Sequence, residues 1–209
     1  MSYLPIGMFN FVRRRLLIAL SCAPAISLLA AETDPAAARI RSFYDLLLET
    51  MKQADALGVK GRFEKLAPAV RAVYDLPAMT RIAVGPDWKT FKPEQQTALV
   101  EQFSRMSIAT YASRFDGYSG ERFEVDPATE ERGANRIVRT KIIQKQKEPV
   151  TLNYLVHPAE GSWKVIDVYL SGTISELATR RSEFASILKS GGADALIESL
   201  RQRTNKMLA

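Results

Sequence analysis

The segment SWKVIDVYLSG, residues 162–172, carries a strong strand signal and the turn that follows it. Its apolar side chains occupy nearly consecutive positions, and such runs are typical of a strand that is covered on both faces. Asp167 stands in the middle of the run, where a buried carboxylate without a partner would be costly. After Gly172 the spacing of apolar residues becomes helical. The segment therefore predicts a buried strand that leads into a helix, with a carboxylate that needs an explanation.

Three earlier segments also predict strands, because the apolar spacing changes there from helical toward alternating. They cover residues 121–126, 135–145 and 149–156. The links between the strands are DPATEERGAN, KQKEP and HPAEGS, which are short and have turn-forming compositions. Short links favour antiparallel pairing between strands that follow each other along the chain. We therefore predict an antiparallel meander of four strands that ends with residues 162–170.

Helical spacing of apolar residues occupies the rest of the chain beyond residue 34. Pro68 and Pro77 predict a kinked or broken second stretch, and two glycines end the fourth. The predicted helical stretches are 35–57, 63–82, 93–115, 173–190 and 193–208. The fold class is α+β, with helices packed on one face of a curved four-stranded antiparallel sheet.

The first 31 residues predict a secretory signal peptide. Three consecutive arginines at 13–15 precede the apolar and small-residue segment LLIALSCAPAISLLAAETD, which is the order found in such signals. We expect cleavage after Ala30 or Ala31. The predicted organisation is a signal at 1–31 and a single domain at 32–209.

Charge and cysteine content limit the classes of partner. The whole sequence has a formal net charge of +6, and removing residues 1–31 takes away three Arg and no acids, leaving 26 basic and 23 acidic residues, or +3. No dense basic patch with interleaved aromatic residues remains, which argues against a nucleic-acid partner. A mildly positive surface favours approach to anionic lipid headgroups. The only cysteine, Cys22, lies within the signal, and its lipidation stays open as an alternative to cleavage.

Few residues of the chain are suited to catalysis or metal binding. The single histidine, His157, precedes Pro158 in a predicted turn and cannot supply the several convergent ligands that a metal needs. Ser119 lacks the sequence context of a nucleophilic serine, and no glycine-rich phosphate loop is present. We therefore expect no metal, no cofactor and no nucleophilic catalysis.

Two carboxylates among apolar residues, Asp167 and Asp75, remain as candidate general bases. The favoured interpretation of each is structural. Asp167 is expected to form an ion pair with Arg180 or Arg181 on the following helix. Asp75 is expected to cap a break in the helical stretch or to pair with Arg71, one helical turn earlier.

Two long stretches together resemble one known family. They contain G-x-x-W at Gly85 to Trp88, W-K-V-x-D-V at Trp163 to Val168, and R-x-x-F at Arg181 to Phe184. With these motifs the chain resembles the periplasmic phospholipid-shuttle proteins of the MlaC, or toluene-tolerance auxiliary, family. The wording of DGYSGERFEV and RRSEF is closest to the hopanoid-associated HpnM branch of that family. The resemblance extends from about residue 36 to the end of the chain.

The resemblance implies an NTF2-like fold in which acyl chains lie in an apolar cavity between the helices and the sheet. It implies a periplasmic carrier without enzymatic activity. Such a carrier exchanges phospholipid with an inner-membrane transporter complex and an outer-membrane lipoprotein complex. The HpnM branch implies a hopanoid-type lipid as cargo. The sequence GTISEL after the last strand departs from the family pattern, which implies a different shape at one end of the cavity.

Alternation and helical spacing select the apolar residues that would line such a cavity. Two other functions stay open, a non-catalytic adaptor of a membrane transporter and an NTF2-like enzyme that uses Asp167 or Asp75 as a base. The predicted lipid-binding residues are Val73, Met79, Phe103, Met106, Tyr111, Val138, Ile142, Leu152, Tyr154, Val156, Val168, Ile174, Phe184 and Ile187.

Overall fold

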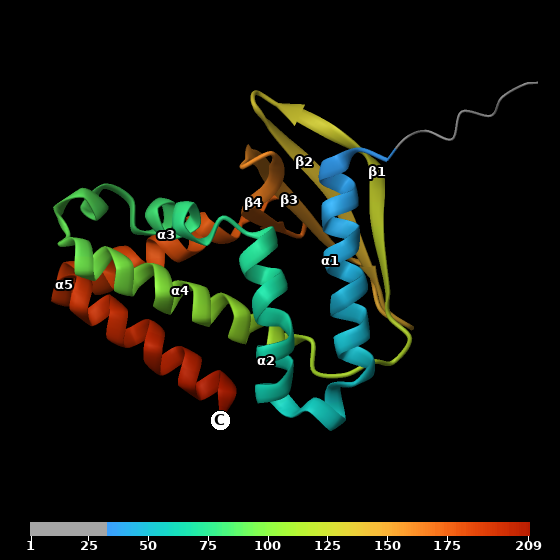
Figure 1. The fold of residues 1–209 in the computed structure, drawn as a ribbon, viewed down its shortest axis with the longest axis horizontal. Coiled ribbons are helices and arrows are strands. Elements are labelled where there is room, and N and C mark those ends of the chain that lie inside the picture. Colours follow the sequence, from blue (N-terminus) through green and yellow to red (C-terminus); the bar gives the residue numbers. More distant parts are fainter. Residues whose placement is uncertain (1–32) are drawn as a thin grey trace, which may run out of the picture. The chain divides into compact units, whose positions relative to one another are not determined.

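The structure, a computed structural model, describes residues 33–209, so the predicted signal peptide and Cys22 lie outside the described residues. Helices and strands follow one another in the predicted order (Figure 1). The helices are α1 (Pro35–Lys52), α2 (Ala54–Val73), α3 (Leu76–Val84), the 3-10 helix η1 (Gly85–Thr90), α4 (Pro93–Arg114) and α5 (Glu176–Leu208). The strands are β1 (Arg122–Arg132), β2 (Asn135–Ile143), β3 (Val150–Ala159), β4 (Ser162–Leu170) and β5 (Ile174–Ser175).

Helix α1 is held at its start by Asp34. The Asp34 carboxylate accepts a hydrogen bond from the amide of Ala36 at 2.8 Å, and it also accepts hydrogen bonds from Thr129 and Arg136 on the sheet. Burial raises the pKa of Asp34, but these hydrogen bonds and the charge of Arg136 outweigh it and hold that pKa below its ordinary value. One carboxylate therefore caps α1 and joins it to β1 and β2.

The prolines of the second helical stretch act differently from each other. Pro68 lies inside α2 without ending it, whereas the chain leaves the helix at Tyr74 and Asp75. Pro77 stands in the first turn of α3, where a missing amide hydrogen costs no helical bond. Within α2 the only residue with non-helical backbone angles is Gly58, at φ 59°.

The sheet has five antiparallel strands in the order β1-β2-β3-β4-β5, so the prediction of four strands was wrong by one. The fifth, β5, is only two residues long and pairs with the end of β4. Strand β1 continues through Pro127 to Arg132, where a turn was predicted, and its register shifts between Val125 and Thr129. Because β1 is an edge strand with a bulge at this point, a proline is tolerated there.

Strand β3 includes His157 and Pro158, which were predicted to lie in a turn. The turn is formed instead by Glu160 and Gly161, whose φ angles are 51° and 73°. Two consecutive residues with positive φ make the tight two-residue turn that fits the twist of a hairpin. Pro158 is tolerated because β2 pairs with β3 only as far as Val156, which leaves β3 without a neighbour on that side.

One face of the sheet is covered by helices. Helix α1 lies along β1 and β2 and also contacts β4 (Figure 1). Pairing of Thr140 with Leu152, and of Leu152 with Leu170, places these residues on one face. On the same face Tyr44 of α1 bonds Thr140 and Tyr154 through its hydroxyl, at 2.8 and 2.9 Å. The predicted helix-facing side of β2 and β3 is therefore the side that meets α1.

Helix α5 consists of two segments that meet at Gly192. The φ of Gly192 is 65°, a left-handed conformation that only glycine adopts at little cost, so the chain reverses where the sequence predicted a break. Glu183 in the first segment bonds Arg203 in the second at 2.8 Å. Helix α4 packs against α5 (Figure 1). None of the helices within residues 33–209 has the length and apolar character needed to cross a membrane.

Candidate binding cavity

A cavity of about 260 Å³ lies between the helices and the sheet. Helix α4 contributes residues at successive three- and four-residue steps, which is the spacing of one helical face. Strands β2, β3 and β4 contribute their helix-facing residues, and α1 contributes none. The cavity is lined by Val70, Tyr74, Met79, Phe103, Met106, Ser107, Thr110, Tyr111, Arg114, Phe115, Ile142, Val150, Leu152, Val168, Leu170, Glu176, Leu177 and Arg180.

The residues predicted from sequence divide into two groups. Those that line the cavity are Met79, Phe103, Met106, Tyr111, Ile142, Leu152 and Val168. Those that belong to the packed core instead are Val73, Val138, Tyr154, Val156 and Phe184, with Ile187 partly buried against it. Ile174 is 56% exposed in the short strand β5, so it faces neither the core nor the cavity.

Sequence reasoning missed the polar part of the cavity wall. Ser107, Thr110 and Arg114 lie on the same face of α4 as Phe103 and were passed over because only apolar residues were selected. Their spacing from Phe103 follows the helical period, which was a usable signal. The part of the wall formed by α4 therefore combines apolar residues with polar ones.

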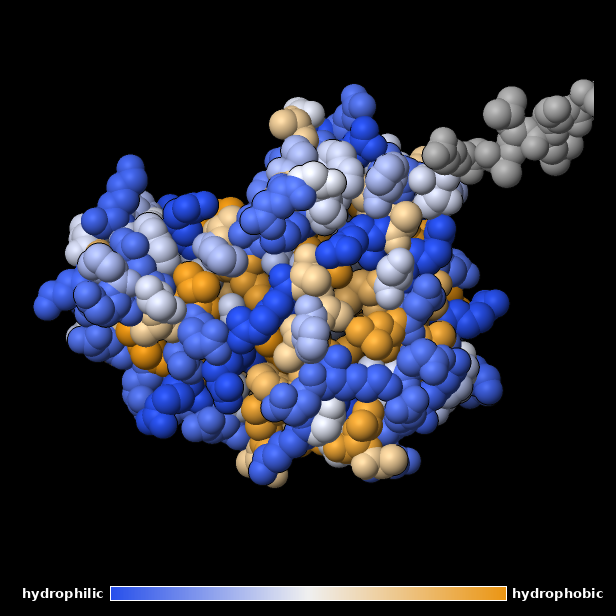
Figure 2. Space-filling view, viewed as in Figure 1, coloured by the Kyte–Doolittle hydropathy of each residue, from blue (hydrophilic) through white to orange (hydrophobic). Residues whose placement is uncertain are grey.

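Charged and exposed residues mark the opening of the cavity. Arg114 is exposed and Val150 is 42% exposed, although both line the cavity. Glu176 and Arg180, in the first turns of α5, form an ion pair at 2.8 Å beside it. Figure 2 shows that apolar residues reach the surface among hydrophilic ones on the face that it draws. An apolar interior with a charged rim suits a ligand that is apolar at one end.

Four tyrosines join the cavity wall to the core. Tyr74 and Tyr111 line the cavity and are hydrogen-bonded to each other through their hydroxyls, and Tyr44 donates to Tyr154 at 2.9 Å. Burial raises the pKa of all four phenols, well above the ordinary value for Tyr74 and Tyr154. The phenols stay neutral near pH 7 and pair with each other, so they cannot act as bases and leave little polarity toward the cavity.

Asp167 does not form the predicted ion pair, so that prediction was wrong. Its carboxylate accepts hydrogen bonds from the hydroxyl of Ser175 and from the amide of Leu177 at 3.1 Å. Arg180 pairs with two glutamates instead, and Arg181 lies against Gly85. The carboxylate is stabilised instead by the amide of Leu177 and the hydroxyl of Ser175 at the N-terminus of α5, where a negative charge is favoured.

Asp167 is also outside the cavity. The residues that line the cavity include Val168 and Leu177, which adjoin Asp167 in the strand and in a hydrogen bond, but Asp167 itself is not among them. The side chain is 8% exposed and engaged in hydrogen bonds. It cannot reach a substrate in the cavity, and the interpretation of Asp167 as a catalytic base loses its support.

Asp75 has the structural role predicted for it. One carboxylate oxygen accepts from the amide of Ala78 at 3.0 Å and caps α3, and the other contacts His157 Nε2 at 3.0 Å. Arg71, the alternative partner, pairs with Glu101 on α4. Within residues 33–209, no three histidine, cysteine or carboxylate side chains converge as a metal site would require.

Known proteins show the same fold and a related sequence. The profile of the family described as MlaC protein matches residues 41–202. The toluene tolerance protein ttg2D of Pseudomonas putida is 25% identical over 201 residues, which cover 90% of this chain and 87% of that protein. A solved phospholipid-binding protein from Ralstonia solanacearum, in complex with a phospholipid, aligns with a TM-score of 0.74 and 25% identity over 84% of this chain and 100% of that one. The chain belongs to the MlaC protein family.

Proposed function

We propose that this chain is a periplasmic carrier that binds a phospholipid and holds an acyl chain of that lipid inside the cavity. The observation that carries the proposal is the cavity itself, whose wall is apolar inside and charged only at the opening. A lipid has the same division between its chain and its headgroup. The related structure from Ralstonia solanacearum, solved with a phospholipid, supports the choice of ligand. In this proposal the carrier shuttles lipid between an inner-membrane transporter complex and an outer-membrane lipoprotein complex.

The size and lining of the cavity favour a flexible chain as cargo. Its volume of about 260 Å³ is slightly below the usual range for ligand pockets, about 300–1,000 Å³, so a bulky cargo requires the wall to move. Met79 and Met106 in its wall are flexible side chains that adapt to an irregular ligand. A rigid hopanoid-type lipid, the cargo suggested by the HpnM-like motifs, requires these methionines to move apart. The two kinds of cargo therefore make different demands on the same wall.

Extraction of bound lipid tests the proposal. Protein purified gently from its native cells is extracted with organic solvent, and the extract is analysed by mass spectrometry. We expect phospholipid in near-stoichiometric amount, whereas a hopanoid in its place would assign the cargo to the second lipid class. Absence of both lipids, together with no uptake from vesicles, would leave the adaptor function in place of the carrier.

Two neighbouring isoleucines of β2 provide a matched pair of variants. Ile142 lines the cavity, whereas Ile143 follows it and does not. Ile142→Trp fills part of the cavity and is expected to reduce the amount of bound lipid, because the added ring occupies the space of the chain. Ile143→Trp adds the same volume on the other face and is expected to leave bound lipid unchanged. Equal lipid content in both variants, with both folded by circular dichroism, would contradict the location of the site.

A further inference from the structure

A second cleft, of about 300 Å³, adjoins the opening of the cavity. It lies between the C-terminal turns of α4 and both segments of α5. Its polar lining residues are Thr110, Ser113, Arg114, Arg180, Arg203 and Lys206. Thr110, Arg114 and Arg180 line the cavity as well. Because they share these residues, the cleft is continuous with the opening of the cavity.

The cleft holds more positive than negative charge. Glu183 contacts Arg180 at 3.4 Å and Arg203 at 2.8 Å, and Glu176 contacts Arg180 at 2.8 Å. The hydrogen bond from Arg203 and the charge of Arg180 hold the pKa of Glu183 below its ordinary value, so this carboxylate is ionised at neutral pH. The four cations of the cleft thus face two carboxylates, and the balance is positive.

Two cations of the cleft make no ion pair within residues 33–209. These are Arg114 and Lys206, both exposed. Each stands in the last turn of its helix, where a cation is favoured by the helix dipole. The dipole accounts for each residue separately. It does not account for two helix ends that place their cations around one cleft, at the opening of an apolar cavity.

The geometry points to an anion site for the phosphodiester group of a phospholipid whose chain lies in the cavity. This inference rests on the proposed function and adds a defined headgroup contact to it. The planar guanidinium of Arg114 matches two phosphate oxygens, and the ammonium of Lys206 supplies a second, mobile charge. Arg180 is held at the junction of cavity and cleft by its two glutamates.

A comparison of two lipids with identical chains tests the inference. The probes are dioleoyl phosphatidylglycerol and dioleoylglycerol, which lacks the phosphate. Each lipid is supplied in micelles of a neutral detergent that contain no other phospholipid, and is equilibrated with delipidated mature protein. Bound lipid is measured by mass spectrometry. In the double variant Arg114→Gln, Lys206→Gln we expect phosphatidylglycerol affinity to fall about 3- to 30-fold, because two exposed charge contacts are lost. Dioleoylglycerol affinity is expected to stay unchanged.

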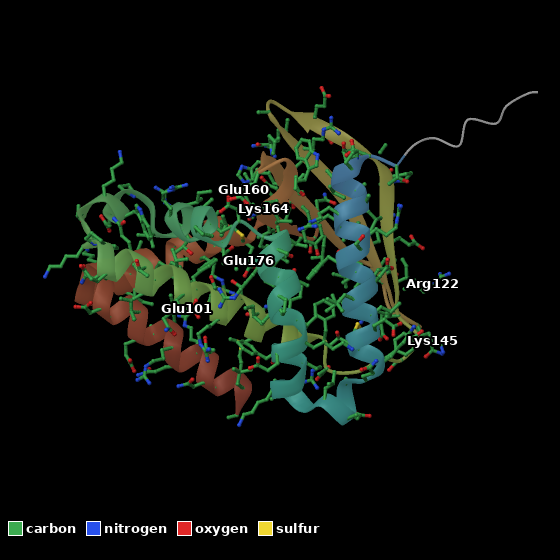
Figure 3. The ribbon with its side chains drawn as sticks, in the orientation of Figure 1. Glu101, Arg122, Lys145, Glu160, Lys164 and Glu176 are labelled. Carbon is green, nitrogen blue, oxygen red and sulfur yellow. The ribbon has the colours of Figure 1, made fainter. Side chains whose placement is uncertain are left out.

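Arg122→Gln is the matched control. Arg122 is exposed at the start of β1 and makes no ion pair within residues 33–209. Figure 3 shows it at the far edge of the sheet, well separated from Glu176. Arg122→Gln removes one positive charge where the double variant removes two, so a general effect of net charge on anionic lipid would lower its affinity as well, by a smaller factor. We expect this variant to bind both lipids as the unchanged protein does.

The outcomes separate the inference from the proposed function. If the double variant retains phosphatidylglycerol with unchanged affinity, or loses both lipids equally, the phosphate site is refuted while the carrier function stands. If the unchanged protein binds neither lipid, the carrier function itself fails. Inorganic phosphate, titrated into delipidated protein and followed by phosphorus NMR, distinguishes a headgroup site from a site for free phosphate. Phosphate binding that persists in the double variant would also overturn the assignment.

Discussion

Asp167→Ala is expected to lower the free energy of unfolding by about 3–6 kcal/mol. The carboxylate is 8% exposed and accepts hydrogen bonds from the Ser175 hydroxyl and the Leu177 amide, both at the start of α5. A third donor, the amide of Val168, lies in the same strand, so the alanine variant loses two hydrogen bonds that join the strand to the start of α5. A hydrogen bond to a charged group contributes about 1.5–3 kcal/mol, which gives the expected loss from these two. The variant also leaves the buried amide of Leu177 and the half-buried hydroxyl of Ser175 without this partner.

Asp167→Asn separates the charge of the carboxylate from its shape. The amide keeps one oxygen to accept from Leu177 but loses the attraction of an anion to the N-terminus of α5, so we expect a loss of about 1–3 kcal/mol. Urea unfolding followed by far-ultraviolet circular dichroism gives the free energy by linear extrapolation. Asp45→Asn, at an exposed position of α1, is the control and should change stability by no more than about 0.5 kcal/mol.

The same variants test how α5 supports the cavity. The first turns of α5 carry Glu176, Leu177 and Arg180, which line it. Loosening this helix start is expected to reduce bound lipid together with stability. If Asp167→Ala unfolds at the same urea concentration as the Asp45→Asn control, the assignment of Asp167 as the anchor of α5 is refuted.

Three further changes have expected outcomes. Arg62→Met is expected to lower the free energy of unfolding by about 2–4 kcal/mol. The buried guanidinium donates to the carbonyl of Ala112 near the end of α4 at 2.8 Å and to that of Ala54 at the start of α2 at 2.9 Å. Lys60→Met, at an exposed position, is the control in the same urea assay. Gly192→Ala is expected to lower the free energy of unfolding by about 1–2 kcal/mol because of the positive φ alone, since no atom lies within 4 Å of the added carbon. Gly117→Ala, with equal space and no positive φ, is the control and should lower it less when both variants are unfolded by heat. The pKa of Asp34 is lower in the folded than in the unfolded protein, so its contribution to stability is complete above the unfolded pKa of about 3.9 and is lost as pH falls through the folded pKa. The urea midpoint of Asp34→Asn should therefore decrease less between pH 5 and pH 2 than that of the unchanged protein. An equal decrease in the two proteins would contradict the argument.

The order of elements could be predicted because apolar spacing is a local property. The boundaries that failed depend on what lies next to the strand. Pro127 and Pro158 have the composition of turns, yet each lies in a strand at a place where no neighbour requires its missing amide hydrogen. Whether a strand has a neighbour at a given residue is set by register, and register is not visible in a single segment.

The partner of Asp167 was out of reach for a related reason. Sequence reasoning paired the carboxylate with the nearest arginines, Arg180 and Arg181, because side-chain charges are visible in a sequence. A backbone amide at the start of a helix also stabilises a carboxylate, but every residue except proline has one, so the sequence does not show which amide will be the partner. Ile174 was predicted to line the cavity because its spacing to Leu177 is helical, but it belongs to the two-residue strand β5 and is exposed.

Core and cavity residues could not be separated by type, because both are apolar, and the structure shows what distinguishes them. Val138 and Tyr154 are fully buried under α1, which lies directly on that part of the sheet. Ile142 and Leu152, on the same face, line the cavity instead. An empty volume among packed elements costs stability, because its lining atoms lose contacts. The polar contacts of Arg62 and Asp167 hold the end of α4 and the start of α5, the two helices whose residues line the cavity, and so offset part of that cost.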